Sequence, residues 1–474
     1  MTSVLQQVFG RGGGFRGGIF LPPRRETTAG MPVQSLPPPS FLCVPLQYDD
    51  GPPATPCVEV GDRVRGGDRI GRADSPDAVD VHAPLAGRIT ALVRVDSARR
   101  TDIPAMRLEI SPDQAEQPPT PLRVPDDWDG PGLDELVQAA EAGGVTDDRA
   151  SPAGLAALLA ETHRRGVRHV IINALPGEPM LTAGAVLLDD HLDAIVRLAG
   201  WIGMAVGAEH TWLAVDRADG ARLRRCRIAA RRVPLGRTRR TRMPAPQETH
   251  RAAPVAGATV RLAPLANKYP QHVPVVLAAS IVGVETPPGG TTLDVGVLVL
   301  EARTMVDLAT ALAWAGHEPV PMTHRVVTVT GPAVARPGHY RIPVGTRFED
   351  VLRHVGLRQA VRRVVDGGPL TGRALGHLDV VVTKHTSGVL ALDRATDRVP
   401  EPGPCVRCGW CQDDCPVGLD PQALLDLAER GDVTAATAWH PRACVECGLC
   451  SYVCPAQLPL AEGVARLKRA VSCK

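Results

Sequence analysis

The chain has 474 residues, of which 44% are apolar and 22% charged, with a formal net charge of +2 at pH 7. This length and apolar content are sufficient for three or more domains, each with its own core. The nearly balanced charge argues against a chain that wraps nucleic acid, and we predict no nucleic-acid partner.

Residues 1–40 are rich in Gly and Pro and predict an extended, poorly packed arm. The arm begins without the apolar segment of a signal peptide or anchor. Farther along, no apolar stretch reaches the roughly 18 residues that a membrane-spanning helix needs.

Residues 41–110 contain short segments of alternating apolar and polar residues, separated by turn glycines. Two such segments, around 58–71 and 81–89, predict a small flattened β-barrel. The pattern resembles the barrel-sandwich hybrid fold of lipoyl and biotinyl domains. The lysine that carries the cofactor in those domains is missing, so we expect a structural or docking role here.

Residues 130–325 alternate between helical and strand patterns. Helices are predicted over 132–142, 153–165, 191–198 and 221–232, and strands over 167–173 and 211–215. Such a rhythm predicts a partly parallel sheet with a ligand crevice at its carboxyl edge.

Residues 326–375 combine a strand at 326–330, a helix at 348–354 and several glycine turns. This composition predicts a compact β-grasp-like module.

The most specific feature lies in residues 401–474, where a C-x2-C-x2-C-x3-C-P run occurs twice. This spacing is typical of proteins with two [4Fe–4S] clusters, in which three thiolates of a run bind one cluster and the fourth binds the other. A helix over 421–435 should join the runs of this helical, ferredoxin-like domain. We expect Trp410 and Tyr452 to pack in its small core, and the alternative is that they shield the clusters from water. The predicted ligands are Cys405, Cys408, Cys411 and Cys454 for the first cluster, and Cys444, Cys447, Cys450 and Cys415 for the second.

Zinc knuckles and disulfides are the alternatives for so many cysteines. Zinc sites usually pair two C-x2-C steps across a longer gap and need no repeated four-cysteine run with a trailing proline. Disulfides are not expected in a chain without a secretory signal. The pattern therefore favours iron–sulfur clusters and one-electron chemistry.

Taken together, the multidomain α+β chain resembles the C subunit of the Rnf-type ion-translocating electron transport complex. The resemblance rests on Phe15-Arg16-Gly17-Gly18-Ile19, the barrel-sandwich segment, the two cysteine runs, and a glycine pattern that ends in Gly367-Gly368-Pro369 and is similar to the soluble-ligand-binding β-grasp (SLBB) domain. It implies a peripheral subunit on the cytoplasmic face of a bacterial inner membrane. Its implied partners are the membrane subunits and a ferredoxin-like B subunit.

The resemblance also implies that the central domain accepts hydride from NADH on FMN and passes single electrons to the clusters, in a complex that couples this flow to ion translocation. The family's phosphate loop, G-x-G-G-x-G-F-P followed by lysine, corresponds here to residues 142–152. No glycine follows Gly144 until Gly154. Asp147 and Asp148 lie where a phosphate would be expected, and the lysine is missing. Acids repel a phosphate, and Cβ atoms hinder close approach of the backbone.

Two further family motifs survive in part, around Asn173 to Glu178 and at Lys268-Tyr269-Pro270. The resemblance makes Asn173, Glu178 and Lys268 candidate FMN or NADH contacts. Two alternatives stay open at this point: an NADH-oxidising subunit with an altered loop, or a flavin-free two-cluster relay with a vestigial nucleotide site. A corrinoid-reductase-like role is a third, and it would also need flavin.

Overall fold

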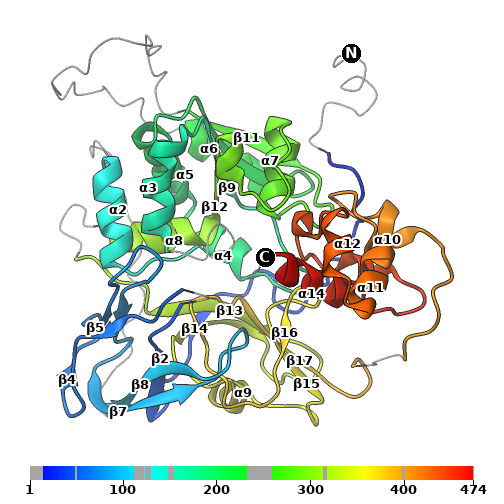
Figure 1. Cartoon of the computed structure of the whole chain (residues 1–474). Helices are drawn as coiled ribbons and strands as arrows, with labels where there is room; N and C mark the ends of the chain where they lie inside the picture. Colours follow the sequence, from blue (N-terminus) through cyan, green and yellow to red (C-terminus); the bar gives the residue numbers. More distant parts are fainter. Residues whose placement is uncertain are drawn as a thin grey trace.

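The computed structural model describes residues 14–48, 51–111, 122, 130–147, 154–231, 259–312, 318–397 and 401–472. In Figure 1 two sheet-rich parts lie at the bottom, a helix-covered sheet lies above them, and a helical region lies at the right. None of the helices in the described ranges is both long and apolar enough to cross a bilayer.

The first part is a sandwich of two small antiparallel sheets, which confirms the predicted barrel-sandwich fold. One sheet has the order β2–β8–β7–β4 and the other β3–β5–β6. Inward-facing apolar residues of both sheets, including Leu42, Ile70 and Met106, form one buried core. The strands are β2 (Phe41–Pro45), β3 (Thr55–Pro56), β4 (Arg63–Val64), β5 (Arg69–Arg72), β6 (Val81–His82), β7 (Gly87–Val95) and β8 (Ile103–Ile110).

The central part has a parallel sheet with the order β11–β10–β9–β12, in agreement with the predicted α/β rhythm. Its strands are β9 (His169–Asn173), β10 (His210–Asp216), β11 (Val260–Leu265) and β12 (Val297–Glu301). The helices are α2 (Leu133–Ala142), α3 (Leu155–Arg165), α4 (Ala183–Asp190), α5 (Leu192–Ala205), α6 (Gly220–Arg231), α7 (Pro274–Val282) and α8 (Ala302–Ala311), with a 3-10 turn at Thr292–Val295.

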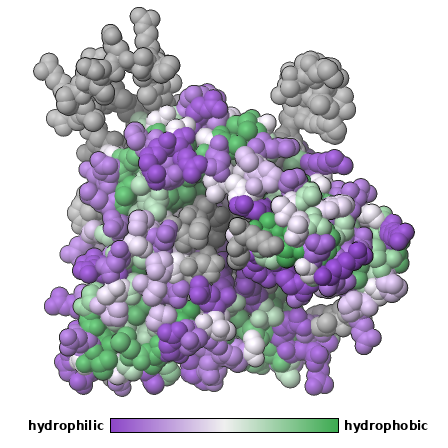
Figure 2. Space-filling view, in the orientation of Figure 1, coloured by the Kyte–Doolittle hydropathy of each residue, from purple (hydrophilic) through white to green (hydrophobic). Residues whose placement is uncertain are grey.

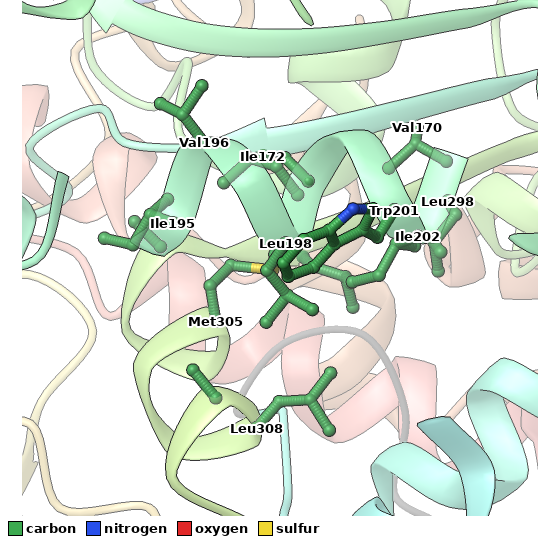
Figure 3. Close-up of a cluster of buried hydrophobic side chains, with 14 of the residues drawn as sticks. Val170, Ile172, Ile195, Val196, Leu198, Trp201, Ile202, Leu298, Met305 and Leu308 are labelled. Atoms are coloured by element: carbon green, nitrogen blue, oxygen red, sulfur yellow. The ribbon is translucent and has the colours of Figure 1, made fainter. Parts of the chain in front are cut away.

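Both faces of this sheet are covered. On one face, Leu198 and Trp201 of α5 and Met305 of α8 pack against the strands (Figure 3). On the other face, Leu277 of α7 packs against Ile171 and neighbouring strand residues. Because both faces are buried, the strands are nearly continuous runs of Val, Ile and Leu.

The strand order reverses beside β9. The chain runs outward from β9 to β10 and β11, then returns to place β12 on the other side of β9. In open parallel sheets the ligand crevice lies at the carboxyl ends of the strands at such a point. Here those ends are Asn173 of β9 and Glu301 of β12.

The third part is a sheet with the order β1–β14–β13–β17–β15–β16, covered by helix α9 (Phe348–Val355). Its strands are β1 (Val33–Ser35), β13 (His324–Thr330), β14 (Gly338–Pro343), β15 (Arg363–Asp366), β16 (Arg373–Ala374) and β17 (Gly388–Leu392). The expectation of a poorly packed arm is wrong around β1, because β1 pairs with β14 and Leu36 is buried in the core of this sheet.

The C-terminal helical region, residues 401–472, contains α10 (Trp410–Asp413), α11 (Pro421–Arg430), α12 (Val433–Thr437), a 3-10 turn (Pro441–Ala443), α13 (Leu449–Val453) and α14 (Leu460–Ser472). The single helix predicted over 421–435 is wrong. Gly431, in the left-handed conformation, ends α11, and the Asp432 side chain caps α12 by accepting a hydrogen bond from the Ala435 amide at 2.9 Å.

Candidate functional site

One set of cysteines surrounds a cavity of about 180 Å³ in the C-terminal helical region. Cys405, Cys408 and Cys411 of the first run line it together with Cys454 of the second. Cys405 and Cys408 are exposed and Cys454 is buried, so we call these residues the exposed set.

A second set lines a smaller and more closed cavity of about 30 Å³. Cys444, Cys447 and Cys450 of the second run meet Cys415 of the first there. None of these four side chains is exposed, and we call them the enclosed set. In both sets the fourth cysteine comes from the other run.

Burial makes free thiolates costly in the enclosed set. It raises the pKa of Cys444 to about 11, and with smaller contributions from Cys444 and Cys415 it raises the pKa of Cys447 to about 12. The pKa of Cys450 is raised as well, chiefly by burial. Buried thiolates of this kind are stabilised when they bind a cationic metal centre.

The donor chemistry fits two [4Fe–4S] clusters. Each set brings four thiols around one cavity. Among the described residues no three His, Cys, Asp or Glu side chains lie close enough to hold a single metal ion. A [4Fe–4S] cluster, when bound, supplies one-electron transfer.

The two sets differ in their surroundings. Val406, Trp410 and Tyr452, next to the cysteines of the runs, are 64%, 54% and 56% exposed. Figure 2 shows apolar surface over this region, at the right of the view. The prediction that Trp410 and Tyr452 pack in a core is therefore wrong, because both rings face outward.

The enclosed set instead faces the rest of the molecule. Cys447 and Leu449 pack with Tyr269 in a small buried cluster. Ile19 of the arm and Leu370 of the turn that follows β15 complete this cluster. Four segments that are far apart in sequence thus meet at the enclosed set.

Asn173 lies at the carboxyl end of β9 and is buried. Its side-chain amide donates to the carbonyl of His272 and to Oε1 of Glu301, each at 2.8 Å. Its Oδ1 accepts from the Leu175 amide at 3.2 Å. The structure thus places Asn173 at the carboxyl edge of the sheet, where its side chain is hydrogen-bonded to other parts of the chain.

Glu178 is also buried, but it lies against the turn after β15. Its carboxylate accepts hydrogen bonds from the amides of Leu370 and Thr371 at 3.0 and 3.1 Å, and from Thr371 Oγ1 at 2.6 Å. Lys268 contacts the arm. Its Nζ lies 5.0 Å from the centre of the Phe15 ring and donates a hydrogen bond of 3.4 Å to the backbone carbonyl of Phe15. The three candidate contacts therefore face different neighbours.

Asp147 lies in the loop that corresponds to the family's phosphate loop. Its Oδ2 accepts a hydrogen bond of 3.1 Å from the backbone amide of Glu301, the N-cap residue of α8. Amides at a helix N-terminus are a common anion site, and here a carboxylate of the chain itself takes it. With Asp147 and Glu301 both acidic, the residues present do not fit a phosphate at the start of α8.

The sequence indicated this acid in the loop, but not its partner at the start of α8, which lies 154 residues away. The other acid of the loop, Asp148, falls outside the described residues, as do 149–153. Tyr269 was not among the residues that the sequence singled out as candidate contacts. Its position in the Lys268-Tyr269-Pro270 motif gave no sign that its hydroxyl contacts the Cys447 carbonyl.

Family models match three stretches of the chain. The RnfC barrel sandwich hybrid domain matches residues 13–115, the Nuo51 FMN-binding domain residues 150–310, and the SLBB domain residues 326–374. These matches confirm a multidomain chain with barrel-sandwich, Nuo51-like and SLBB parts. The FMN-binding model and the family together suggest flavin and iron–sulfur cofactors.

Curated relatives extend the similarity over most of the chain. The C subunit of an ion-translocating oxidoreductase complex from Rhodobacter capsulatus is 28% identical, covering 89% of this chain and 76% of the relative. The C subunit of the Na⁺-translocating ferredoxin:NAD⁺ oxidoreductase complex from Acetobacterium woodii is 27% identical, covering 88% of each chain. The C subunit of an ion-translocating oxidoreductase complex from Erwinia tasmaniensis is 31% identical, covering 90% of this chain and 49% of the relative. The three domain matches follow one another along the chain, and together with these relatives they support its assignment to the RnfC family.

Proposed function

We propose that this chain is the peripheral iron–sulfur electron-transfer subunit of an Rnf-type complex. In such a complex, electron transfer on the NADH and ferredoxin side is coupled to ion translocation. The observation that supports this most directly is the pairing of the two cysteine runs into two crossed sets around two cavities. The names of the relatives support the assignment to the complex.

The proposal includes a place and partners. The subunit acts at the cytoplasmic face of a bacterial inner membrane, where it contacts the membrane subunits and a ferredoxin-like B subunit. The exposed set and its apolar surroundings suit electron exchange with such a protein, because transfer needs close approach of the two centres. The cluster of the enclosed set would then exchange electrons on the side that faces the rest of the protein.

Within this role, the central domain acts without flavin. The observation that favours this second reading is the hydrogen bond from the Glu301 amide to the Asp147 carboxylate at the start of α8. A flavin phosphate would have to displace a bonded carboxylate and lie beside a second acid. The chain would then be a two-cluster relay whose nucleotide crevice is closed by its own side chains.

One experiment tests both the two-cluster electron-transfer function and the absence of flavin. The anaerobically reconstituted protein is incubated with FMN and desalted, and its visible spectrum is recorded before and after NADH and then dithionite. Bleaching by dithionite with an iron content near eight per chain, the content of two [4Fe–4S] clusters, supports the cluster assignment. Retained flavin and bleaching by NADH would overturn the flavin-free relay but keep the electron-transfer role. A protein without iron–sulfur absorbance would overturn the function itself.

A further inference from the structure

Hydrogen bonds link the enclosed cysteine set to the SLBB part through two residues of the altered nucleotide motifs. We propose that Tyr269 and Glu178 position the Cys447 loop and set the reduction potential of the cluster bound by the enclosed set. This inference rests on the proposed two-cluster function. It gives these two residues a role other than flavin or NADH binding.

Tyr269 provides the direct contact. Its ring is buried, and its hydroxyl donates to the backbone carbonyl of Cys447 at 2.6 Å. Its backbone is fixed by two hydrogen bonds with Ile19 of the arm, at 2.8 and 3.0 Å. Because both the hydroxyl and the backbone of Tyr269 are hydrogen-bonded, its side chain keeps the Cys447 peptide in one orientation. The loop that carries the Cys447 thiol is thereby kept in place as well.

Glu178 provides the second link. Its Oε1 lies 3.3 Å from the Tyr269 hydroxyl, while both carboxylate oxygens accept from Leu370 and Thr371 of the SLBB turn. Gly368 permits this approach, because a Cβ there would lie 2.5 Å from Cβ of Glu178. The turn and the carboxylate therefore form one rigid unit.

The same turn contacts the cluster loop from the other side. Gly448 follows Cys447 with a φ of +74°, and a Cβ on it would lie 2.4 Å from the Leu370 carbonyl. Leu370 thus joins Glu178 to the cluster loop by its amide and by its packing. A movement of the SLBB turn would therefore also shift the loop that contains Cys447.

The two side chains should act on the potential in opposite directions. Reduction adds a negative charge to the cluster, and hydrogen bonds and nearby charge are known to tune cluster potentials. The Tyr269 hydroxyl points its positive end at the Cys447 loop and favours the reduced form. The buried Glu178 carboxylate disfavours the reduced form, and burial keeps its field from being screened.

The test is an EPR-monitored redox titration of the reconstituted full chain, comparing wild type with Tyr269→Phe and Glu178→Gln. Tyr340→Phe is the matched control, because Tyr340 is also buried and donates to a backbone carbonyl, that of Arg336 at 2.9 Å, within the SLBB core. A Cys450→Ser sample identifies which signal belongs to the enclosed set.

We expect Tyr269→Phe to shift the midpoint potential of the enclosed-set cluster to more negative values and Glu178→Gln to shift it to more positive values. The other cluster and the control should match wild type. Selective loss of the enclosed-set signal in Tyr269→Phe would also support the positioning role. Unchanged potentials, or equal shifts of both clusters, would overturn the inference. A wild-type chain without two cluster signals would instead overturn the proposed function.

Discussion

Lys384 is buried where three parts of the molecule meet. Its Nζ donates to the carbonyl of Asp80 in the barrel sandwich at 3.1 Å and to that of Gly144, after α2, at 2.5 Å. Burial lowers the pKa of Lys384 to about 7, although the negative charges of Asp80 and Asp307 act in the opposite direction. The residue therefore joins the parts through hydrogen bonds while its charge opposes burial.

This position predicts a pH-dependent stability. An unfolded chain keeps the proton of Lys384 up to its ordinary pKa of 10.5, whereas the folded chain releases it near 7. Because the unfolded state binds more protons between these values, the free energy of unfolding should rise with pH across that window. Relative to Lys384→Met, the wild type should gain roughly 3 kcal/mol between pH 7 and pH 9.5.

Chemical denaturation of both proteins at the two pH values measures this gain. Comparison with Lys384→Met removes the contributions of all other titrating groups, which the two proteins share. A stability difference that stays constant with pH would show that Lys384 is neutral, or charged, in both states.

At the scale of the elements, the crossing of the cysteine runs is a consequence of two short helices. Gly409 and Gly448, both with positive φ, begin α10 and α13, and each run continues through its helix to a fourth cysteine. The helices carry Cys415 and Cys454 toward the cavities of the opposite runs. Each proposed cluster site therefore draws its thiols from both runs.

The crossing predicts which cysteine variants share a defect. Cys411→Ser and Cys454→Ser should each reduce the same EPR signal, although 43 positions separate them in the sequence. Cys415→Ser, only 4 positions after Cys411, should reduce the other signal. Cys226→Ser is the control, since this buried thiol lies in the α/β core and should leave both signals intact. If the Cys411 and Cys415 variants lost the same signal, the ligand partition would be wrong.

The pattern of apolar residues in the sequence predicted the elements whose apolar side chains pack in a core. Helix α9 and strands β9 and β10 lie close to their expected ranges. Strand β1 could not be predicted in the same way, because its three residues gain their structure from pairing with β14, about 300 residues later. The cysteine sets follow from local spacing, whereas the roles of Asp147 and Glu178 depend on partners 154 and 193 residues away.

At the scale of the whole molecule, the N-terminal arm joins the C-terminal helical region to the central part. The Gly18 amide donates to the Asp414 carbonyl at 2.8 Å, and Ile19 forms an antiparallel bridge with Tyr269. The arm thus passes between Cys415 of the enclosed set and the motif that contains Tyr269. The arm therefore contacts both the first cysteine run and the central part, and in Figure 1 its trace passes beside the helical region at the right of the view.

Gly17 lies where the backbone of the arm passes close to the backbone of Cys415. It has a φ of +68°, and a Cβ on it would lie 2.6 Å from the Cys415 carbonyl. Gly17→Val should therefore cost about 1–2 kcal/mol for the left-handed backbone, and more for the overlap with Cys415. Since the overlap falls on a ligand of the enclosed set, we expect loss of that cluster's EPR signal and faster amide exchange around Asp414 and Tyr269.

Gly30→Val separates the two causes, because Gly30 has a φ of +74° with no atom within 4 Å of the added Cβ. Both variants suffer the backbone strain, but only Gly17→Val crowds the cysteine run. Hydrogen exchange and EPR on the two variants should therefore show a change at the enclosed set in Gly17→Val alone. Equal changes in both would mean that strain in the arm, and not its contact with Cys415, determines how firmly the cluster region is held.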